Sequence, residues 1–223
     1  MATYIDFTTQ VLIMIISLVI HENAHARMAY ILGDDTAKNM GRFSLNPLKH
    51  LHPVGTVLPF IMYFFKVPPI GFARPVKFNH YNFKHPIIYT ILTAFAGPLA
   101  NLVIAVLALL LFNRLIFLPP ELLSCTNEFI HKIYYINAIL LFFNLLPISP
   151  MDGSRLYISV ILKYSPKAAS ITESFSLGVF VFLAMTPEFF RRVFNIEGDA
   201  LELYFSWCSN TLIQFLMPVL STG

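Results

Sequence analysis

The sequence predicts an all-α membrane protein, a multi-pass bundle of five or six transmembrane helices, and two observations support this fold class. First, 57% of the 223 residues are hydrophobic and only 12% are charged, whereas charged residues make up about 25% of a soluble globular domain. Second, long apolar stretches recur along the chain with few charges inside them. Because lipid rather than water surrounds a membrane bundle, such a chain needs little charged surface.

Each apolar stretch is interpreted by its length, because a helix needs about 20 apolar residues to cross a bilayer. The stretches 7–32 and 86–112 meet this length. The stretch 54–65 is too short for an upright span and predicts a tilted, partial or re-entrant element. The last two stretches, 171–185 and 201–220, are weaker candidates for spans.

The stretch 133–162 is also long enough to span, but Pro147 and Pro150 interrupt it. A proline inside a helix removes a backbone hydrogen bond and clashes with the preceding turn. We therefore expect the helix to break near residues 147–153, where the freed backbone must be buried in protein or face water.

The connections and charges add expectations about topology. Residues 33–53 and 66–86 are rich in Gly, Pro, Asn and His, which predicts ordered loops or short strands. Eight of the fifteen Lys and Arg residues lie between Arg27 and Lys84, which predicts a cytoplasmic side for this part. Because the first ten residues lack a basic residue, we expect the first stretch to be retained rather than cleaved as a signal peptide. The net charge of +3 is too small and too scattered to predict a nucleic-acid partner.

The first candidate site lies in the first apolar stretch, where His21, Glu22 and His25 form an HExxH pattern. Residues four apart share one face of a helix, so His21 and His25 can bind a single metal ion. Glu22 can then reach a water molecule at that ion and act as a general base, as in zinc hydrolases. Ionisable groups inside a membrane are costly unless they are paired, metal-bound or facing water. A polar cluster at the membrane interface is the alternative.

A catalytic zinc site needs a third protein ligand, and Asp152 is the candidate. It is the only acidic residue between Glu128 and Glu173, and it follows the two prolines of the expected helix break. Gly153 permits a tight turn there, which could direct the carboxylate towards a metal ion. The alternative is that Asp152 caps the following helix, residues 154–162, as aspartate commonly does.

Asn144 lies in an apolar run shortly before this break. A buried amide needs hydrogen-bond partners. It could bond to another helix, or it could hold a substrate backbone and help to stabilise an oxyanion.

Together these motifs resemble the site-2 protease family of intramembrane metalloproteases. That family joins HExxH to a later Asn-x-x-Pro-x(4)-Asp-Gly segment, which Asn144, Pro147, Asp152 and Gly153 match. Residues 97–101, Gly-Pro-Leu-Ala-Asn, look like its Gly-Pro-x-x-Asn element.

The likeness covers about residues 10–165, and no motif of the final third matches. The runs 41–47 and 71–76 look like the small branch of the family that lacks a PDZ domain. One departure is His52, where we expect an acidic residue.

The resemblance implies a zinc-dependent endopeptidase that hydrolyses a peptide bond in or near a transmembrane segment of another membrane protein. It implies that His21, His25 and Asp152 bind one zinc ion per chain, that Glu22 is the catalytic base and that Asn144 contacts the substrate.

We expect one domain over residues 1–223, with a catalytic core at about 7–165 and a candidate substrate gate in helices at about 170–220. The small size and the lack of extra domains indicate a multi-pass protein of the prokaryotic plasma membrane. The expected partners are the lipid bilayer and a transmembrane protein substrate.

Two other classes of function use similar residues. A metal-binding or metal-transporting membrane protein could use the same ligands without hydrolysis, but it would not need Glu22 beside them. A di-iron lipid oxidase would have to recruit nearly all seven histidines of the chain.

Overall fold

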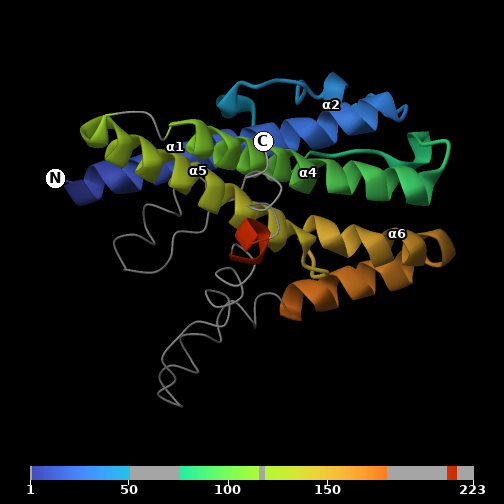
Figure 1. The fold of residues 1–223 in the computed structure, drawn as a ribbon. Helices are drawn as coiled ribbons and strands as arrows, with labels where there is room; N and C mark the ends of the chain where they lie inside the picture. Colours follow the sequence, from blue (N-terminus) through green and yellow to red (C-terminus); the bar gives the residue numbers. More distant parts are fainter. Residues whose placement is uncertain (1, 51–75, 116–118, 180–209, 215–223) are drawn as a thin grey trace, which may run out of the picture.

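The structure is a computed structural model, and it describes residues 2–50, 76–115, 119–179 and 210–214. Every regular element in these ranges is helical, as the sequence predicts. The body consists of the three long helices α1 (Ala2–Ile31), α4 (Pro86–Arg114) and α5 (Pro120–Leu145). Helix α4 packs along both α1 and α5 (Figure 1).

Two helical segments of the described residues are long and apolar enough to cross a membrane, Thr8–Ile31 and Pro86–Phe112. They correspond to the first two long stretches of the sequence. The stretch 54–65 lies outside the described residues. The two C-terminal stretches are described only in part, as helical residues 166–179 and 210–214. The total of five or six spans therefore stays a prediction.

The predicted helix break is confirmed. Helix α5 ends at Leu145, and the chain then turns into the short helix η4 (Asp152–Ser154) and into α6 (Arg155–Tyr164). The cause is local, because a residue that precedes a proline is forced away from helical backbone angles. Leu146 precedes Pro147 and has extended angles, with φ −57° and ψ 133°.

Small residues let α4 and α5 approach each other closely. Their shared core contains Ala105, Ala108 and Ala138, together with the nearly inaccessible ring of Tyr134. Without a hydrophobic force between helices in lipid, close van der Waals packing of this kind holds them together.

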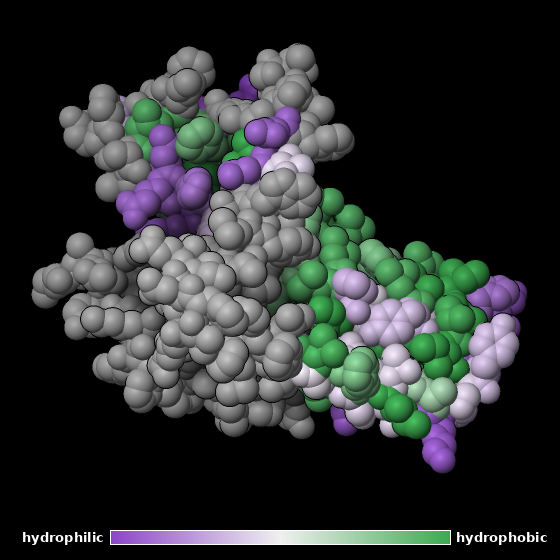
Figure 2. All heavy atoms as spheres, turned by 90° about the horizontal axis from the view of Figure 1, so that it is seen from below, coloured by the Kyte–Doolittle hydropathy of each residue, from purple (hydrophilic) through white to green (hydrophobic). Residues whose placement is uncertain are grey.

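Apolar side chains also cover outward-facing surfaces. On α1, Leu12 and Ile16 are 55% and 59% exposed. Figure 2 shows apolar side chains gathered over the end of the molecule formed by α6 and residues 166–179, where Phe175 is 75% exposed. Exposed patches of this kind fit a chain that lipid surrounds.

Asp34 connects the loop after α1 to the segment before α4. Its fully buried carboxylate accepts hydrogen bonds from the backbone and hydroxyl of Thr36, from the backbone N–H of Asn79 and from the side chain of Asn82. Burial alone would raise the pKa of Asp34, but these hydrogen bonds outweigh it and lower the pKa below its ordinary value.

The described loop residues contain short helices in place of the short strands that the sequence allowed. These helices are α2 (Thr36–Asn39), η1 (Pro47–Lys49) and η2 (His80–Asn82). No strand occurs in residues 33–50 or 76–86.

Candidate metal centre

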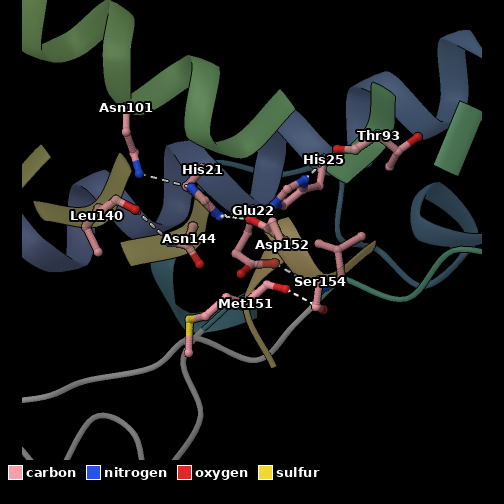
Figure 3. A network of polar contacts seen from close by, with 11 residues as sticks. His21, Glu22, His25, Thr93, Asn101, Leu140, Asn144, Met151, Asp152 and Ser154 are labelled. Carbon is pink, nitrogen blue, oxygen red and sulfur yellow. Dashed lines mark hydrogen bonds and ion pairs between the residues drawn. The ribbon is translucent and has the colours of Figure 1, made fainter. Parts of the chain in front are cut away.

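Helix α1 presents His21 and His25 on one face, one turn apart. Both side chains are buried, with 3% and 6% of their residue surface exposed. Their rings meet edge to face with centroids 4.6 Å apart, and their Nε2 atoms are 3.0 Å apart. The two nitrogens therefore point at a common place (Figure 3).

The turn after α5 brings Asp152 to the same place. Its Oδ2 atom lies 3.2 Å from Nε2 of His21 and 3.2 Å from Nε2 of His25. This oxygen is buried, and it has no hydrogen-bond partner among the residues that the structure describes. Helix α6 does not use it as a cap, because the N-cap residue is Ser154.

The three atoms have the spacing that a zinc ion requires. Zinc bonds nitrogen and oxygen at about 2.0–2.1 Å in tetrahedral sites, which places neighbouring ligand atoms about 3.3 Å apart. The observed separations are 3.0, 3.2 and 3.2 Å. All three residues thus offer ligand atoms within one small group that could hold a metal ion.

Two glycines allow these elements to approach each other. A Cβ atom on Gly97 of α4 would lie 2.4 Å from Nε2 of His25 and 2.6 Å from Nε2 of His21. A Cβ atom on Gly153 would lie 2.3 Å from the carbonyl oxygen of Leu145. Any larger residue at either position would therefore displace a ring or the turn that carries Asp152.

The other nitrogen of each histidine ring faces α4. Nδ1 of His25 lies 2.7 Å from the carbonyl oxygen of Thr93. Nδ1 of His21 lies 3.0 Å from Nδ2 of Asn101. Outer contacts of this kind orient metal-binding histidines. Asn101 stood out in the sequence only through the family resemblance, and a backbone carbonyl such as that of Thr93 has no signature in a sequence.

Glu22 belongs to the same cluster (Figure 3). Its half-buried carboxylate accepts a hydrogen bond of 2.9 Å from the backbone N–H of Val76. The segment after residue 75 therefore orients the candidate base. No pattern in the sequence predicts this contact, because the donor is again a backbone group.

Asn144 lies near the end of α5, close to the cluster but without a described bond to it (Figure 3). Its amide donates a 2.9 Å hydrogen bond to the carbonyl oxygen of Leu140, one turn earlier in the same helix. Among the described residues it has no bond to another helix. His52 and residues 71–75 lie outside the described residues.

Curated relatives share most of the chain. The protein named "Putative zinc metalloprotease YwhC" from Bacillus subtilis is 36% identical over 181 residues, which cover 79% of this chain and 80% of that protein. "Putative zinc metalloprotease Rip2" from Mycolicibacterium smegmatis is 29% identical and covers 82% of this chain and 68% of its own length. Rip2 from Mycobacterium tuberculosis is also 29% identical, over 78% of this chain and 65% of its own length.

No protein-family model and no solved structure matches the chain. The relatives nevertheless extend over about four-fifths of it, and YwhC exceeds 30% identity. The chain therefore belongs to the site-2 protease family of zinc metalloproteases, the family of YwhC and Rip2.

Proposed function

We propose that this chain is a zinc-dependent intramembrane endopeptidase that hydrolyses a peptide bond in or near a transmembrane segment of another membrane protein. The observation that carries the proposal is the convergence of His21, His25 and Asp152 beside Glu22. These residues come from two segments far apart in the sequence, and they match the ligand and base set of a zinc hydrolase.

The donor set fits zinc, with one ion per chain. Two imidazole nitrogens and one carboxylate oxygen leave the fourth tetrahedral position open for water or substrate, as catalytic zinc sites require. When bound, zinc supplies a Lewis acid that activates water and polarises the scissile carbonyl. The buried Oδ2 atom of Asp152 supports this assignment, because it faces the two candidate ligand nitrogens and has no hydrogen-bond partner among the described residues.

Glu22 is the proton carrier of the proposed reaction. It takes a proton from the attacking water and passes it to the leaving amine. The backbone N–H of Val76 holds one carboxylate oxygen in place, which supports a fixed orientation of the base. Asn144, at the edge of the cluster, contacts the substrate backbone in this proposal.

The position of the site supports a substrate within the membrane. His21, Glu22 and His25 lie inside the candidate span Thr8–Ile31. A transmembrane substrate must unwind locally there, because helical hydrogen bonds shield its peptide bonds. The proposed location is a bacterial cell membrane, which the chain crosses five or six times.

Residues at about 170–220 form the gate in this proposal. Helical residues 166–179 overlap the start of this region, and they contact the segment that carries Asp152. Ser176 accepts a hydrogen bond of 2.8 Å from the backbone N–H of Ser149, and Arg155 lies 3.6 Å from Glu173. Movement of this helix would therefore shift the segment that carries Asp152 and so change the geometry of the candidate metal centre.

The deciding experiment measures zinc content and proteolysis in the same preparations. Purified wild type should hold about one zinc ion per chain, and Asp152→Ala should lose most of it, since a third ligand disappears. The matched control is Asp35→Ala, which removes an exposed acid that makes no side-chain capping bond. It should keep its zinc.

Glu22→Gln separates hydrolysis from metal binding. The variant should keep its zinc but cleave a model transmembrane substrate about 100- to 10,000-fold more slowly, because general base catalysis is lost. Normal cleavage by Glu22→Gln would remove the role given to Glu22. Zinc binding without cleavage in any wild-type assay would favour a metal-binding or metal-transporting protein.

A further inference from the structure

Helix α4 presents three residues, each four positions apart, to the two candidate metal-binding histidines. Thr93 faces His25 through its carbonyl oxygen, Gly97 lies against both rings, and Asn101 faces His21. Residues at this spacing share one face of a helix. One helix therefore contacts both rings, at their Nδ1 atoms through Thr93 and Asn101 (Figure 3) and beside their Nε2 atoms through Gly97.

The proton of His25 can be assigned from its partner. A carbonyl oxygen only accepts hydrogen bonds, so Nδ1 of His25 donates to Thr93 across 2.7 Å. In the neutral ring the lone pair then lies on Nε2, the atom that faces His21 and Asp152. This is the tautomer that a metal ligand needs.

The contact at His21 has two arrangements with opposite consequences. If the amide nitrogen of Asn101 donates to Nδ1, the neutral ring carries its proton on Nε2 and cannot bind a metal there. A half-turn of the amide exchanges its nitrogen and oxygen without changing its shape. The oxygen then accepts a hydrogen bond from the Nδ1–H group, and Nε2 is free to bind a metal.

Burial does not favour the first arrangement. Asn101 is completely buried, and its Oδ1 atom has no hydrogen-bond partner among the described residues. In either orientation one end of the Asn101 amide lacks such a partner, so the free-energy cost of burying the amide is similar in both. The contact with His21 therefore decides between the two.

We propose that Asn101 is a positioning residue whose side-chain oxygen accepts a hydrogen bond from Nδ1 of His21 and so fixes the metal-binding tautomer. With Thr93, it makes α4 the support of both histidines. This inference rests on the proposed metal centre. Loss of such an outer partner typically weakens metal affinity about 10- to 100-fold.

The test is a zinc affinity measurement by competition with a chelator, on the full chain in detergent. Asn101→Leu keeps the size but removes the acceptor, so its affinity should fall about 10- to 100-fold. Asn101→Asp offers only acceptors, so it should bind zinc at least as tightly as wild type. The absorption spectrum of bound cobalt, which reports ligand geometry, should change in the leucine variant and stay close to wild type in the aspartate variant.

The matched control is Asn137→Leu. Asn137 is also a completely buried asparagine, but it bonds to Ser17 and to its own helix rather than to a metal ligand. Its zinc affinity should stay within about twofold of wild type. Wild-type affinity in Asn101→Leu would overturn the inference while leaving the proposed function intact.

Should Asn101→Leu fail to fold, Asn101→Asp still tests the assignment, because weaker zinc binding in that variant would contradict an accepting role. An absence of zinc from the wild type would instead overturn the proposed function itself.

Discussion

At the scale of single residues, the candidate metal centre depends on small side chains as much as on its candidate ligands. Gly97 is the clearest case, because a methyl group in its place would lie within 2.6 Å of both histidine rings. The rings cannot yield without leaving Asp152, which contacts both of them. Packing and metal binding are therefore coupled at this glycine.

Gly97→Ala should reduce zinc binding and destabilise the protein by about 1–3 kcal/mol, the usual cost of overpacking. Helix propensity alone predicts the opposite, since alanine is favoured over glycine by about 1 kcal/mol inside a helix. The measurements are zinc content and the thermal unfolding temperature in detergent.

Gly178→Ala is the control for this prediction. Gly178 lies in helical residues 166–179, and no atom of the described residues lies within 4 Å of the place where its Cβ atom would be. This variant should be as stable as wild type or more stable, and it should keep its zinc. Equal behaviour of the two alanine variants would contradict the close packing of α4 on the histidines.

The sequence singled out residues that the structure brings together, and the reason is physical. His21, Glu22 and His25 are fixed relative to one another by a single helical turn, so their spacing alone places them together. Asp152 could be predicted as the third ligand because so few acidic residues occur in the apolar part of the chain. The contacts of Thr93 and Val76 were not predictable, since backbone groups supply them.

At the scale of elements, Asp34 determines how the loop after α1 meets the segment before α4. Its carboxylate accepts four hydrogen bonds, two of them from residues of the second segment. That second segment begins with Val76, which holds Glu22. The network thus connects loop structure to the orientation of the candidate base.

Asp34→Asn should destabilise the protein by about 1–3 kcal/mol at neutral pH. Both carboxylate oxygens of Asp34 accept hydrogen bonds, whereas the amide group of asparagine has only one accepting oxygen. The folded pKa lies below the ordinary value of 3.8, so the contribution of the carboxylate is present above about pH 4. It is lost as the pH falls through the folded pKa. The difference in unfolding temperature between wild type and variant, measured from pH 7 to pH 3, should therefore be constant near neutral pH and should shrink as the pH falls below about 4.

The exposed neighbour Asp35 provides the comparison for this prediction. Asp35→Asn should differ little from wild type at any of these pH values. A constant gap between wild type and Asp34→Asn over the whole range would show that the charge of Asp34 contributes nothing.

At the scale of the whole molecule, apolar length predicted α1 and α4, and the prolines predicted the break between α5 and α6. Helix α5 itself begins at Pro120, thirteen residues before the apolar stretch that the sequence marked. Neither pattern could predict how the helices face each other, because that depends on packing along their whole length. Asn144 illustrates the limit. The sequence left open a bond to another helix or a contact with a substrate, and the one described bond stays within α5.

Ser176 connects the proposed gate to the turn that carries Asp152. It accepts a hydrogen bond from the backbone N–H of Ser149, and it lies 3.1 Å from the hydroxyl of Tyr157. Both residues are near the turn that carries Asp152. Ser176 itself is only 9% exposed, so water cannot easily replace its hydroxyl.

Ser176→Ala should therefore leave the Ser149 N–H without its partner, at a cost of about 1–3 kcal/mol. Because the loosened turn holds Asp152, zinc affinity should fall although no ligand has changed. Chelator competition measures this, with Ser174→Ala as the control, since Ser174 is exposed on the same helix. If Ser176→Ala lowers the rate of cleavage but not the affinity for zinc, the helix acts on substrate entry rather than on the metal centre.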